Sequence, residues 1–103
     1  MLKVLVLYPQ PADANQFDKD YQDHLQLLHE KMGIPTDVKP YTVTKLFPTP
    51  AGSPAFYQIF SMPFASMEEL QGAMSSAAMQ EVGADAARIS SGGAPVILIG
   101  NEE

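Results

Sequence analysis

Three segments of this chain have the length and composition of β-strands and are apolar on both of their alternating faces. They are residues 2–8, in which valines alternate with leucines, and residues 55–62 and 95–99. A strand with this pattern is covered on both sides. The sequence therefore predicts a sheet that packs one face against helices and needs a partner for the other, because an open apolar sheet is an association surface.

Two helical regions separate these strands. The first begins near Asp13, which can cap it, and its apolar residues recur at helical spacing until Gly33 ends it. The second covers 66–89 and opens with a capping box at Ser66. The pair Ser75-Ser76 interrupts this second region, so we expect two helical pieces there.

A further strand is predicted at 37–47, where β-branched and aromatic residues alternate with polar ones. Pro40 within it indicates an edge position or a bulge, and the aperiodic, proline-rich segment 48–54 reads as a hairpin loop. The resulting order β-α-β-β-α-β is typical of an α+β, ferredoxin-like fold. We expect a four-stranded antiparallel sheet with both helical regions on one face.

The chain length fits one domain, 1–103, with a small core. A domain of 103 residues buries about 65% of the surface that its unfolded chain exposes. Burial of the uncovered sheet face against a second copy would enlarge that core. The sequence therefore predicts a homodimer formed through the sheet face.

Charge and composition exclude several classes of function. Six Lys and Arg against twelve Asp and Glu give a net charge of -6, and the basic residues are scattered. This disfavours nucleic acids, anionic membranes and an anionic substrate. The absence of cysteine removes thiol chemistry and thiolate metal sites. The apolar start is too short for a secretory signal, so a cytoplasmic protein is expected.

Several short motifs in order along the chain resemble the EthD family (ethyl tert-butyl ether degradation) of the dimeric α+β barrel superfamily. They are Tyr8-Pro9, an Asp13 turn, the run from Phe17 to Leu25, Met74-Ser75-Ser76 and Gly83-Ala84-Asp85. The resemblance implies a dimeric α+β barrel, a pocket between sheet and helices, and an association with catabolism. Relatives use that pocket for cofactor-free oxygenation, decarboxylation or isomerisation of small molecules, and some bind haem there.

Two residues on the inward face of the first helix are candidate catalytic groups. On a helical wheel His24 lies within the apolar stripe, where a neutral imidazole can act as a general base. Asp20, one turn earlier, could orient it. Tyr21 would add a phenolic hydroxyl to the same cleft. The alternatives are a core histidine bonded to backbone and a tyrosine ring that only fills the core.

The candidate ligand-binding residues are apolar or aromatic. They are Phe17, Leu28, Tyr41, Tyr57, Phe60 and Met67. The methionines around the second helical region could add an adaptable lining, or serve as core filler. His29 diverges from His24 on the wheel, so no metal site is expected, and no cofactor is built into the sequence. Asp85 can pair with Arg88 at i+3.

Two functions fit these residues. The first is an EthD-like protein that binds a small hydrophobic compound and transforms it without a cofactor, as an oxidoreductase, lyase or isomerase. The second is a non-catalytic accessory or carrier protein of a degradation pathway. The scarcity of convergent polar residues keeps the second open.

Overall fold

The computed structural model describes all residues, 1–103. Seven elements follow in the order of the chain: β1 (Leu2–Pro9), α1 (Ala14–Met32), β2 (Thr42–Lys45), β3 (Phe56–Phe64), α2 (Met67–Met74), α3 (Ala77–Ile89) and β4 (Val96–Asn101). No helix is both long and apolar enough to cross a membrane.

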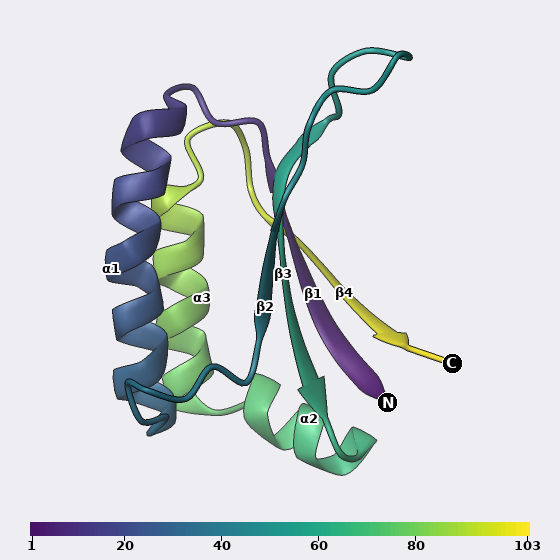
Figure 1. Ribbon diagram of the computed structural model, residues 1–103. Coiled ribbons are helices and arrows are strands. Elements are labelled where there is room, and N and C mark those ends of the chain that lie inside the picture. The colour runs from purple at the N-terminus through teal and green to yellow at the C-terminus, as the bar shows by residue number, and fades with distance from the viewer.

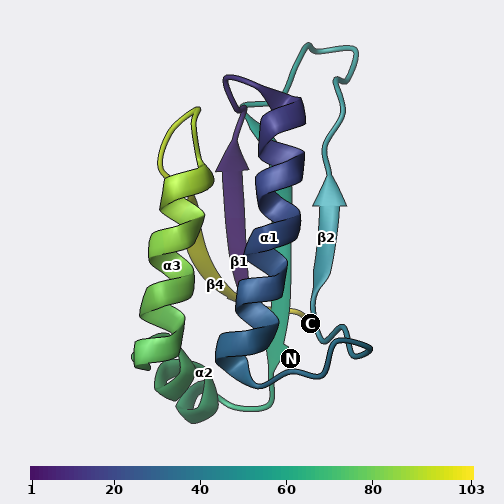
Figure 2. The same ribbon diagram turned by 90° about the vertical axis from the view of Figure 1, so that its left-hand side faces the viewer.

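The four strands form one antiparallel sheet in the order β2-β3-β1-β4. This confirms the ferredoxin-like fold, and β1 lies inside the sheet between β3 and β4. Figure 1 shows α1 and α3 side by side on one face of the sheet, with α2 at its lower end. The view in Figure 2 shows the same two helices in front of the sheet. The opposite face carries no helix.

Serine caps explain why the second helical region breaks in two. The Ser66 side chain accepts a hydrogen bond from the backbone N–H of Glu69 and so caps α2. The Ser76 side chain accepts one from the N–H of Met79 and starts α3 in a new direction. The predicted interruption at Ser75-Ser76 is therefore confirmed.

The strand predicted at 37–47 is wrong in its extent, because only Thr42–Lys45 pairs with β3. Pro40 lies in the preceding connection and has no N–H to donate to a ladder. The strand does lie at the edge of the sheet, as the proline indicated. Beyond it, residues 46–55 form the loop that extends past the body of the molecule in Figure 1.

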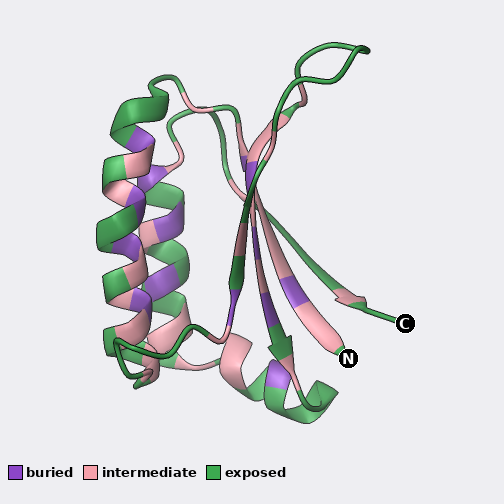
Figure 3. Cartoon of the chain, in the orientation of Figure 1, coloured by how far each residue is buried: buried purple, intermediate pink, exposed green.

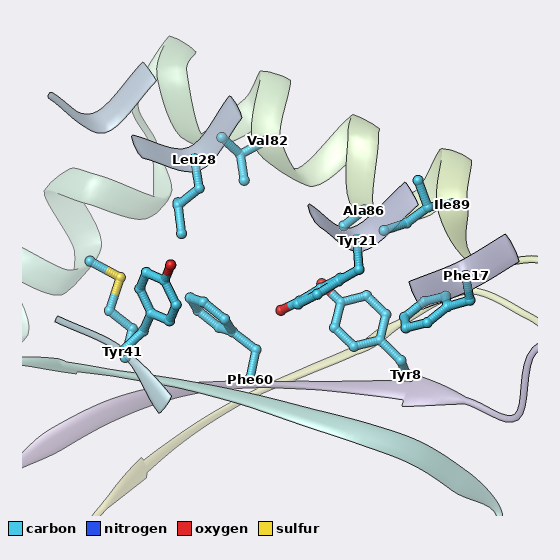
Figure 4. Close-up of a cluster of buried hydrophobic side chains, with 10 residues drawn as sticks. Tyr8, Phe17, Tyr21, Leu28, Tyr41, Phe60, Val82, Ala86 and Ile89 are labelled. Carbon is cyan, nitrogen blue, oxygen red and sulfur yellow. The ribbon is translucent and has the colours of Figure 1, made fainter. Parts of the chain in front are cut away.

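The core lies between the helices and the sheet. Figure 3 shows buried residues along the sides of α1 and α3 that face the sheet, whereas β4 is exposed along most of its length. Aromatic rings fill much of this layer, and Figure 4 shows how Tyr8, Phe17 and Tyr21 pack together. On β1, the side chains that face the helices are therefore those of Val4, Val6 and Tyr8.

Candidate functional site

His24 lies on the buried side of α1 with only 4% of its surface exposed. Asp13 caps the start of α1 by accepting a hydrogen bond from the N–H of Gln16, and Gly33 ends it in the left-handed region at φ 67°. Between these caps, the apolar stripe that includes Tyr21 and Leu28 faces the sheet and carries His24 inward. The inward orientation predicted by the helical wheel is confirmed.

A chain of hydrogen bonds links His24 to the neighbouring helix. Its Nδ1 lies 2.8 Å from Oδ2 of Asp85 on α3, and Oδ1 of Asp85 accepts a hydrogen bond of 2.8 Å from Nε of Arg88. The predicted pairing of Asp85 with Arg88 is confirmed. The suggestion that Asp20 orients His24 is wrong, because Asp20 accepts a hydrogen bond from Gln16 instead.

Burial and the partners of His24 set its charge state. Burial lowers the pKa of His24, and although the hydrogen bond and charge of Asp85 oppose this, the pKa stays below its usual value. Partial burial acts to raise the pKa of Asp85, but hydrogen bonds from His24 and Arg88 outweigh it and hold the pKa below its usual value. At neutral pH the pair is therefore a neutral imidazole beside a carboxylate.

This charge state fixes the tautomer of His24. A carboxylate only accepts hydrogen bonds, so Nδ1 must carry the proton and donate it to Asp85. No protein group hydrogen-bonds the other ring nitrogen, Nε2. Its lone pair is free to accept a proton or a hydrogen bond, as a general base requires.

His24 lines a cavity of about 220 Å³ between the helices and the β1–β4 side of the sheet. Twelve of its fifteen lining residues are hydrophobic. The lining is Val4, Val6, Tyr8, His24, Leu28, Phe60, Met62, Phe64, Met74, Met79, Val82, Gly83, Ala86, Pro95 and Ile97. Its walls therefore come from three strands and all three helices, and they suit a mostly apolar ligand.

The structure brings some of the expected site residues to this cavity and places others elsewhere. His24, Leu28 and Phe60 line it. Tyr21 lies behind the lining, with its ring centroid 5.5 Å from that of His24. Phe17 packs against the rings of Tyr8 and Tyr57 in the core, outside the lining.

Three other expected lining residues lie away from the cavity. Met67 is 43% exposed on α2. The Tyr57 hydroxyl donates to the Asp18 carboxylate at 3.0 Å, on the helix side of the sheet. Strict alternation along β3 would place the Tyr57 side chain on the opposite side of the sheet from its neighbour Gln58. The pairing with β1 is irregular here, because Tyr8 faces Gln58 while Pro9 faces Phe56, and this irregularity leaves Tyr57 unpaired and redirects its side chain.

The third of these residues, Tyr41, binds the second histidine of α1. Nδ1 of His29 donates to the carbonyl of Pro35 at 3.1 Å, and Nε2 accepts a hydrogen bond of 2.8 Å from the Tyr41 hydroxyl. These bonds fasten the connection between α1 and β2 to the helix. They use both ring nitrogens, so His29 has a structural role here.

Two polar residues near the site were missed from the sequence. Tyr8 lines the cavity, and Asp85 is the partner of His24. The alternation of β1 places Tyr8 on the same face as Val4 and Val6, but spacing alone does not say which face the helices cover. Asp85 is 61 residues from His24, so no local pattern joins them. No group of three or more His, Cys, Asp or Glu is placed to hold a metal ion.

Two known proteins are similar in sequence to this chain over almost its full length. The chain is 30% identical over 103 residues to an uncharacterised 11.0 kDa protein from the thcB-thcC intergenic region of Rhodococcus erythropolis, covering 99% of this chain and 96% of that protein. It is also 30% identical to an EthD family protein of Bacillus halodurans, whose crystal structure superposes with a TM-score of 0.82 over 100% of this chain and 99% of that one.

A more distant structure supports the fold alone. A dimeric ferredoxin-like protein of unknown function from a Jannaschia species is 10% identical, with a TM-score of 0.69 over 99% of this chain and 100% of that one. The family model of the EthD domain matches residues 9–93. The chain therefore belongs to the EthD family, as its sequence motifs suggested.

Proposed function

We propose that this protein binds a small, mostly apolar organic molecule in the cavity beside His24 and transforms it by proton transfer, with Nε2 of His24 as the general base. The observation that carries this proposal is the unpaired Nε2 of a cavity-lining histidine whose other nitrogen is held by Asp85. Such a carboxylate fixes the tautomer and stabilises the imidazolium that forms when the base accepts a proton.

The surroundings of His24 support a base that works near neutral pH. Because its pKa lies below the usual value, the imidazole is unprotonated and ready to accept a proton. The apolar walls exclude water from the reacting groups, which strengthens electrostatic interactions among them. Tyr21, in contact with the His24 ring, acts in this proposal as a positioning residue behind the cavity wall.

The family and the open sheet face suggest the setting of this activity. The name of the EthD family refers to the degradation of an organic ether, which favours a role in the catabolism of small organic compounds. The uncovered face carries apolar side chains, and the Jannaschia protein of the same fold is described as dimeric. We therefore include a homodimer, formed through the sheet face into an α+β barrel, in the proposal.

A carrier that binds without chemistry is the second candidate. It is favoured by the lining itself, in which twelve of fifteen residues are hydrophobic. A carrier and an enzyme share the cavity but differ in what they need from His24. Only the enzyme requires its free Nε2.

The methionines provide a test of where a ligand binds. Met62, Met74 and Met79 line the cavity, whereas Met1 and Met67 are exposed outside it. In protein labelled with ¹³C at the methionine methyl groups, 2-naphthol should shift the first three signals and leave those of Met1 and Met67 in place. Shifts confined to the exposed pair would contradict binding in the cavity.

The same titration tests His24 against a matched residue. Wild-type protein should bind 2-naphthol about fivefold more tightly than naphthalene, the effect of one net hydrogen bond to Nε2. His24→Phe should lose this preference. His29→Phe, on the same helix but outside the cavity, should keep it. Equal preference in both variants would remove His24 from ligand recognition.

A further inference from the structure

Tyr8 is the second polar group of the cavity. Apart from His24, it is the only lining residue whose side chain carries a nitrogen or oxygen atom. Tyr8 lies near the end of β1 on the side that faces the helices, and only 2% of its surface is exposed to solvent. Any ligand in the cavity therefore meets two polar groups, one basic and one hydroxylic.

Tyr8 and His24 are close enough to act on one molecule. The ring centroid of Tyr21 lies 5.5 Å from that of Tyr8 and 5.5 Å from that of His24, so the three rings are consecutive neighbours. The charge of Asp85 also reaches the Tyr8 hydroxyl and contributes to the shift of its pKa. Both groups line the same cavity of about 220 Å³, within reach of one small molecule.

Buried polar groups stand behind Tyr8. The hydroxyl of Tyr21 and both polar atoms of the Gln58 amide are buried without a hydrogen-bond partner, and Gln58 is 0% exposed. Gln58 pairs directly with Tyr8 across β1 and β3. Figure 4 shows the hydroxyl ends of Tyr8 and Tyr21 near each other. Neither Tyr21 nor Gln58 lines the cavity, so Tyr8 is the member of this polar group that a ligand can reach.

The Tyr8 hydroxyl is a donor rather than a base. Burial raises its pKa well above the usual value, and the same cause raises that of Tyr21. Both phenols are therefore protonated at neutral pH. The Gln58 amide can donate toward the Tyr21 hydroxyl and the Tyr21 hydroxyl toward Tyr8, which leaves the proton of Tyr8 for an acceptor in the cavity.

Building on the proposed function, we propose that the substrate is a neutral, mostly apolar carbonyl compound with an acidic α-hydrogen, and that Tyr8 hydrogen-bonds its carbonyl oxygen while His24 takes the α-proton. The electron pair of the broken C–H bond forms the enol double bond, and the carbonyl π pair moves to the oxygen. The Tyr8 hydroxyl stabilises the charge that develops there. Return of a proton from His24 to the α-carbon completes an exchange, and in a carbonyl compound with a β,γ double bond its return to the γ-carbon of the dienolate completes an isomerisation, without any redox partner.

The lining argues against an anionic substrate. No lysine or arginine lines the cavity. The nearest charge to the His24 ring is the Asp85 carboxylate, which would repel an anion. A carboxylate or phosphate ligand would therefore lie unpaired among apolar side chains, at a high cost in desolvation.

Hydrogen–deuterium exchange of 2-tetralone tests the inference without knowledge of the natural substrate. Its ring system is apolar, and its carbonyl adjoins a benzylic CH₂ whose protons are acidic. In D₂O, wild-type protein should accelerate loss of the benzylic ¹H signal. His24→Gln should abolish the acceleration, and Tyr8→Phe should reduce it roughly 100-fold, as for loss of one donor to an oxyanion. Tyr57→Phe, which loses a hydroxyl outside the cavity, should behave as wild type.

Binding is measured in the same samples so that the two proposals fail separately. Bound 2-tetralone labelled with ¹³C at the carbonyl should show a downfield shift that Tyr8→Phe loses, while the signals of Met62, Met74 and Met79 still respond. If the probe binds in the cavity but no exchange occurs, or if Tyr8→Phe leaves both exchange and the carbonyl shift unchanged, this inference is overturned and the cavity remains a binding site. Absence of any response from the cavity methionines would overturn both proposals.

Discussion

His24 combines deep burial with a carboxylate partner, and these two influences act on its pKa in opposite directions. Burial disfavours the imidazolium, Asp85 favours it, and burial prevails. Because the imidazole is uncharged at neutral pH, the pair gains no stabilisation from attraction between two full charges. What remains is a hydrogen bond from Nδ1 to Asp85 that orients the ring.

The lowered pKa of His24 makes the protein's stability depend on pH in a definite direction. In the unfolded chain the imidazole takes up a proton near its usual pKa of 6.5, whereas in the folded protein it does so only at lower pH. The unfolded state thus binds more protons below about pH 6.5, and stability must fall as pH decreases through this window. Thermal melts from pH 7.5 to 5.5 should show Tm falling in wild type.

The matched variants separate His24 from the other titrating groups. His24→Gln should show a shallower fall in Tm over the same range, because the differential protonation at position 24 is gone. Met67→Leu, which changes an exposed side chain and no titratable group, should retain the wild-type slope. A parallel decline in wild type and His24→Gln would show that burial of His24 does not disfavour its charged form.

At the residue scale, sequence patterns predicted on which side of its helix a side chain lies, but they did not identify the residues that it contacts. The helical wheel correctly turned His24 inward. It could not find Asp85, since that contact depends on how α1 and α3 lie against each other. Tyr57 was expected among the ligand-binding residues, but its hydroxyl donates to Asp18 outside the cavity, next to an irregular pair between β1 and β3.

At the element scale, the connection between α3 and β4 packs tightly on the connection between β1 and α1. The backbone N–H of Ala12 donates to the Ser91 hydroxyl at 3.1 Å. A Cβ on Gly92 would lie 1.7 Å from the carbonyl oxygen of Gln10. This approach is possible only for glycine, which explains the residue type at position 92.

Gly92→Ala should destabilise the protein by about 1–3 kcal/mol, because the added methyl group forces two backbone segments apart. Gly72→Ala in α2 is the matched control, since its added Cβ meets nothing within 4 Å. This control should stabilise by up to about 1 kcal/mol through helix propensity. Urea unfolding measures both. Equal effects of the two substitutions would show that the two connections do not pack this closely.

The order of elements was predictable because each has its own local signal. The caps at Asp13 and Ser66 predicted two helix starts, and their side chains make the expected bonds, while the interruption at Ser75-Ser76 predicted the break before α3. The extent of β2 was not predictable from its alternation. Only four residues, Thr42–Lys45, are paired in the ladder with β3. Apart from Pro40, no residue in the flanking sequence indicates where this pairing ends.

At the scale of the whole molecule, β4 joins the cavity to the uncovered sheet face. Ile97 lines the cavity and pairs with Val6, so its neighbour Leu98, which pairs with Leu5, points to the opposite face. Four consecutive apolar residues of this edge strand are 38–51% exposed: Val96, Ile97, Leu98 and Ile99. An edge strand of this kind is a site of association. Contact with a second copy would cover the face and also hold one wall of the cavity.

A comparison of two adjacent residues of β4 tests the proposed homodimer. Leu98 and Ile99 are similarly exposed, at 46% and 51%, but project to opposite faces of the sheet. Light scattering on a sizing column should give wild type twice the 11.2 kDa of one chain. Leu98→Lys should yield the monomer, because it places a charge in the apolar contact between sheets. Ile99→Lys, on the helix side, should remain dimeric. A monomer in wild type at micromolar concentration, or dissociation caused by Ile99→Lys alone, would contradict pairing through the sheet face.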